Sequence, residues 1–306
     1  MKHMRWIALV GACALAVTAL TASACGDDDD DGDDDEPTAA ATQPAAGETP
    51  ADGEPIDISG VEELSDGTLT LGSDIAYAPI EFFDEQNNPV GLDIDLANAM
   101  GEALGVEVVF ENAGFASLLP SLDAERYDAI MSAMTVNEER SAVVDFVEYF
   151  LAGFGIVVQA GNPEAIEDVE DLCGKTVAVQ SATVQVEYLR GTDAEPGGQD
   201  QACKDAGLEG ITVLEFETDP EAVQALIAGQ ADAEMADYPV AQYSAEQTEG
   251  DLVVVSNVDP APYGIAVRKS STALKDALQE ALDQIIEDGT YAAILDEWGL
   301  SDGTIE

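Results

Sequence analysis

Short apolar runs alternate with amphipathic stretches from Thr68 to the end of the chain. Val106–Phe110 and Thr176–Val179 are typical of strands, whereas Asp93–Leu104 and Thr272–Glu287 place apolar residues at helical spacing. A chain that alternates strands and helices in this way is predicted to fold as an α/β protein. Its 306 residues are enough for about one to three domains.

Further candidates follow the same pattern. The other strand candidates are Leu69–Gly72, Ala129–Met131, Gly155–Gln159, Ile211–Glu215, Ala231–Glu234, Leu252–Val255 and Gly264–Arg268. The other helix candidates are Ala116–Ala124, Ser181–Arg190, Pro220–Ala228, Pro239–Thr248 and Tyr291–Trp298. Two capping boxes, Thr135 with Glu138 and Thr218 with Glu221, predict helix starts before apolar positions.

The composition is strongly acidic, since 63 Asp and Glu oppose 10 Lys and Arg, for a formal net charge of −53. Nucleic-acid binding is disfavoured because no cluster of Lys and Arg exists to neutralise phosphates. Anionic membrane surfaces would repel the chain for the same reason. After residue 25, no apolar run approaches the roughly 20 residues needed to span a bilayer, so only the N-terminus is directed to a membrane.

The N-terminal segment has the order of a secretory signal. Lys2 and Arg5 precede an apolar stretch over 6–20, and small residues then lead into Cys25. Two kinds of processing fit this order: cleavage by ordinary signal peptidase, or lipoprotein processing that makes Cys25 the lipidated first residue. A signal peptide over 1–24 is expected in both cases.

Residues 25–67 are acidic and rich in Pro and Ala, with an almost unbroken acidic run over 27–36. A segment of this composition cannot bury a core, and it predicts a disordered, solvated tether. Because a tether makes sense when its start is anchored, lipidation of Cys25 is favoured. We therefore expect an exported protein that is lipid-anchored to the outer, extracellular or periplasmic face of the cell membrane.

Two of the four cysteines remain for the folded part, because one leaves with the signal and Cys25 is the lipidation candidate. In an exported chain Cys173 and Cys203 predict a disulfide, whose loop of about 30 residues stabilises the fold by roughly 3–4 kcal/mol. A metal site is the alternative, but it needs more ligands, and the sole histidine, His3, leaves with the signal. No metal and no cofactor are expected.

Six motifs follow one another along the chain. They read GSDIAYAPIEFFDEQNNPVGLDIDLANAMGEALG (72–105), LLPSLDAERYDAIMSAMTVNEERSAVVDF (118–146), DLCGKTVAVQSATVQ (171–185), ALIAGQADAEMADYPVA (225–241), PYGIAVRK (262–269) and DGTYAAILDEWG (288–299). Together, over about residues 68–300, they resemble family 3 extracellular solute-binding proteins of amino-acid ABC transporters. The resemblance implies an α/β, two-lobed periplasmic-binding-protein-like (type II) fold with two hinge crossovers, which closes on its ligand.

This resemblance implies that lobe 1 comprises 68–154 plus 261–306 and that lobe 2 is the inserted stretch 155–260. It implies a free amino acid as ligand and the permease subunits of an ABC importer in the cytoplasmic membrane as partners of a monomer. The same fold serves sensing proteins without transport and some dehydratases, so both remain alternatives. An enzyme is disfavoured, because no histidine survives maturation and nothing resembles an added catalytic domain.

An α-amino acid presents a carboxylate and an ammonium group, so a selective cleft needs one cation and one anion. The resemblance places the family's carboxylate-binding arginine at Arg140, whose guanidinium fork suits a bidentate carboxylate. Thr135 is expected to cap the helix of Arg140, whose free N–H groups add positive potential. The resemblance places the ammonium-binding aspartate at Asp237.

Polar residues of two further loops complete this expected site. Thr183 and Gln185 open a helix whose N-terminus suits a carboxylate. Ser132 and Thr135 match the polar positions of a loop in lobe 1. Between them, Met134 packs either on the ligand or in the core.

Asp74, Tyr77 and Phe115 are expected to face the side chain of the ligand. Tyr77 and Phe115 fit the aromatic walls with which the family sandwiches that side chain, by stacking or by cation–π contact. A carboxylate at the end of the pocket needs a donor or a cation. Because of Asp74, we expect basic amino acids to be the preferred ligands and glutamine-like ones to come second.

Overall fold

The structure, a computed structural model, describes residues 56–192 and 197–305. Every described residue belongs to one compact unit of the chain. The expected signal peptide, the lipidation site and the first part of the tether, all within 1–55, lie outside the described residues.

Residues 56–67 belong to the folded part, although their composition predicted a tether. Ile56, Val61 and Leu64 are at most 7% exposed and pack in the largest core cluster, and Glu62–Leu64 forms a short 3-10 helix. The tether boundary at residue 67 was therefore wrong. Three apolar side chains spaced among acidic and small residues are enough to hold this segment on the core.

The main sheet is built from strands of very different length. Its strands are β1 (Thr68–Ser73), β4 (Glu107–Asn112), β5 (Ala129–Ile130), β6 (Val144–Gln159), β7 (Thr176–Gln180), β8 (Thr212–Phe216), β9 (Ala233–Asp237) and β10 (Leu252–Arg268). Their order in the sheet is β4-β1-β5-β10-β6-β9-β7-β8. A separate hairpin is formed by β2 (Phe82–Phe83) and β3 (Pro89–Val90).

Except for α3 and α5, for which no range was predicted, the α-helices start and end close to the predicted positions. They are α1 (Leu92–Leu104), α2 (Leu118–Asp123), α3 (Glu138–Val143), α4 (Val184–Arg190), α5 (Gly198–Asp205), α6 (Asp219–Ile227), α7 (Tyr238–Gln247), α8 (Thr272–Glu287) and α9 (Thr290–Glu297). The capping box of Thr218 and Glu221 at the start of α6 is confirmed. Across the two described ranges, every helix is too short or too polar to cross a membrane.

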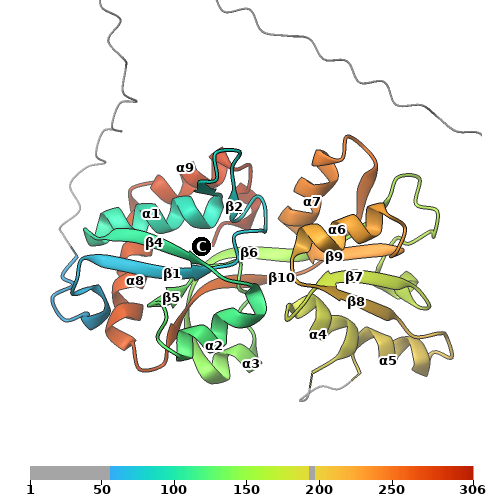
Figure 1. Cartoon of the computed structure of the whole chain (residues 1–306), viewed down its shortest axis with the longest axis horizontal. Helices are drawn as coiled ribbons and strands as arrows, with labels where there is room; N and C mark the ends of the chain where they lie inside the picture. The colour runs from blue at the N-terminus through green and yellow to red at the C-terminus, as the bar shows by residue number, and fades with distance from the viewer. Residues whose placement is uncertain (1–55, 193–196, 306) are drawn as a thin grey trace, which may run out of the picture. The chain divides into compact units, whose positions relative to one another are not determined.

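The long antiparallel strands β6 and β10 connect two lobes (Figure 1). In lobe 1, β5, β1 and β4 extend the sheet from the end of β10, and the helices are α1, α2, α3, α8 and α9. In lobe 2, β9, β7 and β8 extend it from the end of β6, and the helices are α4 to α7. This is the two-lobed α/β fold with two crossovers that the motifs predicted.

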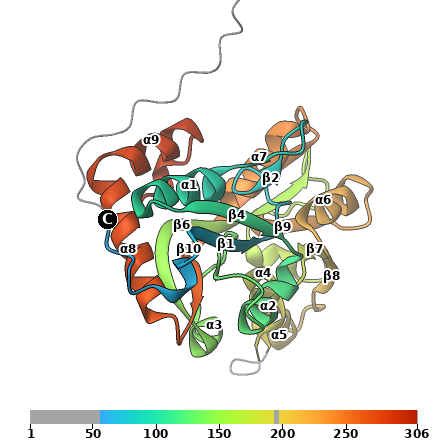
Figure 2. The same cartoon turned by 60° about the vertical axis from the view of Figure 1, so that its left-hand side comes forward.

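Helices cover both faces of each half of the sheet. Figure 1 shows α1 and α9 on one side of lobe 1 and α2 and α3 on the other, whereas α6 and α7 lie opposite α4 and α5 in lobe 2. Figure 2 shows α8 beside α1 and α9, which it contacts. The loops that follow β1, β5, β7 and β9 reach the region where the lobes meet, and ligands of open α/β sheets bind at such carboxyl ends.

The crossover strands are longer than the sequence indicated. β6 begins at Val144 rather than at Gly155. β10 joins the predicted strands Leu252–Val255 and Gly264–Arg268 into one. Pairing along their whole length makes β6 and β10 the only strands that belong to both lobes in the described part of the chain.

Between the lobes, the pairing of β6 with β10 is irregular. The register shifts between Val258 and Ala261. A Cβ atom on Gly153 would lie 2.3 Å from the carbonyl oxygen of Val258, so only glycine permits this close approach of the strands. A ladder interrupted at this point is a natural place for bending.

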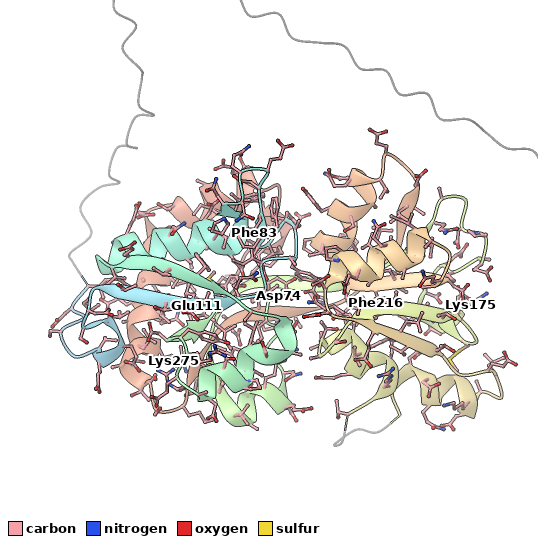
Figure 3. The ribbon with its side chains drawn as sticks, viewed as in Figure 1. Asp74, Phe83, Glu111, Lys175, Phe216 and Lys275 are labelled. Carbon is pink, nitrogen blue, oxygen red and sulfur yellow. A yellow bond between two sulfur atoms is a disulfide. The ribbon has the colours of Figure 1, made fainter. Side chains whose placement is uncertain are left out.

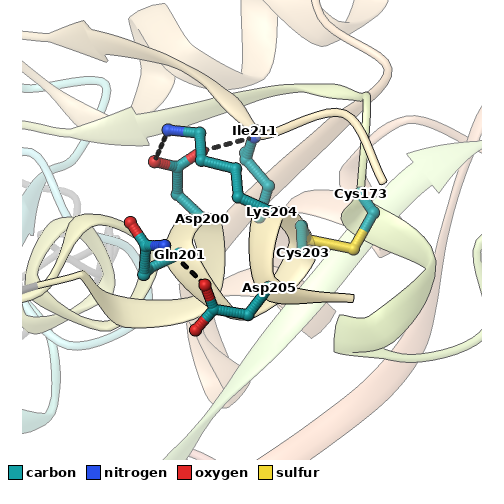
Figure 4. A network of polar contacts seen from close by, with 7 residues as sticks. All are labelled: Cys173, Asp200, Gln201, Cys203, Lys204, Asp205 and Ile211. Atoms are coloured by element: carbon teal, nitrogen blue, oxygen red, sulfur yellow. Dashed lines mark hydrogen bonds and ion pairs between the residues drawn. A yellow bond between two sulfur atoms is a disulfide. The ribbon is translucent and has the colours of Figure 1, made fainter. Parts of the chain in front are cut away.

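The expected bridge between Cys173 and Cys203 is present in lobe 2 (Figure 4). Cys203 lies on α5, a polar helix that the sequence did not predict, and it is buried in the core of lobe 2. Asp200 ties the same helix to the start of β8, because it accepts hydrogen bonds from the backbone N–H of Ile211 (2.9 Å) and from Lys204 (2.5 Å). The disulfide and Asp200 thus hold a helix whose own sequence has little apolar character.

Replacing both Cys173 and Cys203 by serine should lower the unfolding free energy by about 3–4 kcal/mol, because the unfolded chain regains the freedom of the loop. Ligand affinity should change much less, since the bridge lies within lobe 2 and does not cross between lobes. Denaturant titration and calorimetry measure the two effects. Two free thiols in protein purified without reductant, found by mass spectrometry, would contradict the bridge itself.

Candidate functional site

A small cavity lies between the lobes. Both lobes line it. The lining residues are Asp74, Tyr77, Glu81, Phe115, Ser132, Ala133, Thr135, Arg140, Gln180, Thr183, Val184, Gln185 and Asp237. Among these, Arg140 is the sole basic residue.

Arg140 projects from the first turn of α3 and is only 6% exposed. Its guanidinium donates to the backbone carbonyls of Thr135 (2.7 Å) and Ala182 (3.2 Å), and it lies 5.4 Å from the centre of the Phe115 ring. Burial lowers the pKa of Arg140, while the nearby charges of Glu187 and Asp237 raise it. A guanidinium has five N–H donors, so donors remain for a ligand carboxylate.

Asp237 ends β9 and faces the same cavity. Its carboxylate accepts hydrogen bonds from Gln185 (2.7 Å) and from the Tyr263 hydroxyl (2.8 Å), and its backbone N–H donates to the Tyr77 hydroxyl (3.0 Å). Burial raises the pKa of Asp237 to about 6, although these hydrogen bonds and Arg140 oppose the shift. A fixed carboxylate opposite a fixed guanidinium matches the two charges of an α-amino acid.

Asp74, which follows β1, lies where the lobes meet (Figure 3). Its carboxylate accepts a short hydrogen bond from Gln180 of lobe 2 (2.6 Å) and another from the backbone N–H of Phe115. Its own N–H donates to the Ser132 hydroxyl (3.0 Å). Burial raises the pKa of Asp74. The protein itself therefore already supplies hydrogen-bond donors to Asp74, the carboxylate that was expected to select the ligand.

Glu81 lines the cavity with a free carboxylate oxygen. It is 1% exposed, and its Oε1 accepts from the Ser132 hydroxyl (2.8 Å). Its Oε2 is buried and has no hydrogen-bond partner among the described residues. Burial, together with the charge of Asp93, raises the pKa of Glu81 well above its usual range. A buried carboxylate oxygen without a donor is costly, and a ligand cation in the cavity would remove that cost.

A family model matches most of the described chain. The model of the bacterial extracellular solute-binding proteins, family 3, matches residues 69–301. The chain belongs to this family. It is accordingly a solute-binding protein rather than an enzyme.

Several family members are close enough for comparison. The arginine-binding protein ArgT of Corynebacterium glutamicum is 36% identical over 242 residues, which are 78% of this chain and 77% of ArgT. The L-cystine-binding protein TcyJ of Escherichia coli is 28% identical, over 78% of this chain and 85% of TcyJ. The structure of an ancestral arginine-binding protein bound to arginine superposes with a TM-score of 0.68 at 36% identity, covering 76% of this chain and 98% of the other.

The structure brings nearly all the expected site residues of this family 3 protein into one cavity. Those that line it are Asp74, Tyr77, Phe115, Ser132, Thr135, Arg140, Thr183, Gln185 and Asp237. Met134 does not line it, because its side chain packs in a core cluster with Leu118 and Leu122 of α2. Of the two positions open to Met134, the structure therefore selects the core.

The helix of Arg140 is capped by a different residue than expected. Asn137, not Thr135, is the N-cap of α3, and its Oδ1 accepts from the backbone N–H of Arg140 (2.8 Å). The Thr135 backbone instead accepts from the guanidinium. The capping box at Thr135 was therefore wrong, because Asn is also a strong N-cap residue and lies nearer the helix.

Glu81 and Gln180 line the cavity but were not predicted. Glu81 carried a signal in the sequence, since it is an acid among the apolar residues of 79–83. Gln180 carried none, because its bond to Asp74 spans the two lobes.

A second buried acidic pair lies behind Asp237. Asp219 and Glu234 are nearly unexposed, and both carboxyl oxygens of Glu234 are buried without a hydrogen-bond partner among the described residues. Burial raises the pKa of Asp219 to about 7 and that of Asp93 to about 7 as well. Burial also raises the pKa of Glu234 well above its usual range.

Protein stability should therefore fall as the pH rises. These carboxyls have folded-state pKa values above those of the unfolded chain, so the folded state binds more protons between about pH 4 and pH 7. The stability that these protonated carboxyls contribute is fully present below about pH 4 and is lost as the pH rises through about 7. Denaturant titrations at pH 5 to 8 and about 0.5 M salt, where surface repulsion is screened, should show unfolding free energies that decrease by several kcal/mol.

Glu234→Gln should flatten this pH dependence, because the amide has the shape of the carboxyl group but does not titrate. Glu209→Gln removes the same charge from an exposed position and should leave the slope unchanged. A slope equal in wild type and Glu234→Gln would show that the pair does not titrate as described.

Proposed function

We propose that this chain is the extracytoplasmic substrate-binding component of an amino-acid ABC importer and that it captures a basic L-amino acid between its lobes. The observation that supports this ligand class is the buried Oε2 of Glu81, which has no hydrogen-bond partner in the described part of the chain and lies in a cavity that also holds Arg140 and Asp237. The names of ArgT and of the arginine-bound ancestral protein support the same class.

Each end of a basic amino acid has a matching group in the cavity. The α-carboxylate would bind the remaining donors of Arg140, and the α-ammonium would bind Asp237. Phe115 and Tyr77 flank the aliphatic stem, and the side-chain cation meets Glu81 beside Asp74. An acidic side chain would instead meet two buried carboxyls, which disfavours glutamate and aspartate.

A thermal-shift screen of the twenty amino acids, followed by calorimetry, tests this assignment. A ligand at a hundredfold its dissociation constant adds about 2.7 kcal/mol of stability, which is readily detected. We expect basic amino acids first, glutamine and asparagine second, aliphatic residues third and acidic ones last. Tighter binding of glutamate or leucine than of arginine or glutamine would contradict the ligand class.

We also propose that the protein is exported and lipid-anchored at Cys25, after removal of residues 1–24. The supporting features are the signal-like N-terminus and the acidic segment between Cys25 and the first core residue, Ile56. Cys25→Ser should move the protein from the membrane fraction to the medium or periplasm. Retention of Cys25→Ser in the membrane fraction would argue against lipidation.

The lobe boundaries and the partners complete the proposal. We place the crossovers at 154/155 and 260/261, so that lobe 1 comprises 68–154 plus 261–306, with 56–67 added, and lobe 2 comprises 155–260. The permease subunits of the importer would receive the closed, liganded monomer. Co-purification with the permease in the presence of ligand tests this partner.

A further inference from the structure

Several side-chain hydrogen bonds join the lobes directly across the cavity. Arg140 of lobe 1 donates to Ala182, Gln180 donates to Asp74, and the Asp237 backbone donates to Tyr77. Each of these bonds uses a residue that lines the ligand cavity. A substitution at any of them would therefore change ligand contacts and lobe closure together.

One bond between the lobes lies outside the ligand cavity. Nδ2 of Asn137, at the start of α3, donates to Oε2 of Glu187 on α4 (3.0 Å). Neither residue lines the ligand cavity; both line a neighbouring groove beside the crossover residues Pro260 and Ala261. This pair, Asn137–Glu187, can therefore hold the lobes together without touching the ligand.

Asn137 is also fixed within its own lobe. Its Oδ1 accepts from the backbone N–H of Arg140 (2.8 Å), so the two ends of one amide serve two purposes. One end caps the helix that carries Arg140, and the other end contacts lobe 2. The amide is therefore preorganised, and little side-chain freedom is lost when the lobes close.

We propose that Asn137–Glu187 is a clasp that sets the equilibrium between open and closed lobes, and thereby the affinity for every ligand alike. This inference rests on the proposed function. When only the closed form binds tightly, the observed dissociation constant is the intrinsic one divided by the closed fraction. Weakening a contact outside the cavity then multiplies all dissociation constants by one factor and leaves the ranking of ligands unchanged.

The clasp can be broken and rebuilt with small changes. Asn137→Asp keeps an oxygen to cap α3 but places a carboxylate against Glu187. Glu187→Gln keeps an acceptor for Asn137. The double variant Asn137→Asp/Glu187→Gln restores one donor and one acceptor in reversed order. Asn98→Asp, on the exposed face of α1, is a control with the same chemical change.

Calorimetry with arginine and with glutamine measures the affinity of each variant. Asn137→Asp should weaken both ligands by the same factor, about tenfold or more, and should speed their release in stopped-flow experiments. Glu187→Gln also removes a charge that acts on Arg140, so it serves as its own reference, and adding Asn137→Asp to it should weaken each ligand by no more than about threefold. Unequal factors for the two ligands, or no recovery in the double variant, would overturn the clasp.

Small-angle X-ray scattering of the ligand-free proteins separates the clasp from the proposed function. Asn137→Asp should have a larger radius of gyration than wild type, Asn98→Asp and the double variant. Equal radii would overturn the clasp even if amino acids bind as proposed. If no amino acid binds to wild type, the proposed function fails, and the scattering comparison still decides whether the clasp controls closure.

Discussion

Arg140→Ala should weaken amino-acid binding by roughly 30-fold to several thousand-fold, the largest effect expected of any single substitution. The change leaves the ligand carboxylate buried without its cation, which costs about 2–5 kcal/mol. It also removes the contacts to Thr135 and to Ala182 across the cleft. Calorimetry with arginine measures the loss.

Two further substitutions make the Arg140 result specific. Arg140→Lys should recover only part of the affinity, because an ammonium cannot reproduce the bidentate fork. Arg126→Ala removes an exposed arginine from the same lobe and should bind as wild type. Wild-type affinity in Arg140→Ala would exclude Arg140 from the site.

Glu81→Gln should weaken a basic ligand by about tenfold or more while changing glutamine affinity by no more than about threefold. The amide can still accept from Ser132, but it no longer offers a charge to a ligand cation. Glu85→Gln, an exposed change on the same hairpin, should affect neither ligand. Calorimetry with arginine and glutamine measures the selectivity.

Asp74→Asn provides an internal comparison for Glu81. The sequence alone pointed to Asp74 as the residue that selects the ligand, but Gln180 and Phe115 already supply its donors. We therefore expect a smaller loss of selectivity from Asp74→Asn than from Glu81→Gln. Equal losses of arginine and glutamine in Glu81→Gln would mean that Glu81 supports the fold rather than the choice of ligand.

Elements with clear local periodicity were predictable from the sequence. The predicted range Thr272–Glu287 coincides with α8, the prediction for α1 deviates by one residue at its start, and the prediction for α6 deviates by one residue at each end. β6 and β10 were not predictable in full, because the centre of each strand passes from one lobe to the other. The two halves of each strand therefore have different surroundings, and no single alternation of apolar and polar residues runs along the whole strand. Pro260 and Pro262, together with the register shifts, hide the strand pattern of β10 further.

The site was predictable where a motif fixed the position of a residue, as for Arg140 and Asp237. It was not predictable where the role depends on a partner far along the chain. Gln180 becomes part of the site only because lobe closure brings it to Asp74. Glu81 is distinctive only because Ser132 satisfies one of its oxygens and leaves the other free.

The way in which lobe 2 interrupts lobe 1 has a consequence for folding during secretion. The largest core cluster joins Ile56 and Leu69 with Leu278 and Leu295, from opposite ends of the described chain, whereas three further core clusters lie entirely within lobe 2, between residues 156 and 252. Lobe 2, with its disulfide, can therefore complete its core while the C-terminal helices are still being translocated. Lobe 1 has to wait for α8 and α9, so the early half of its sheet stays exposed longest and is where chaperone protection and aggregation should concentrate.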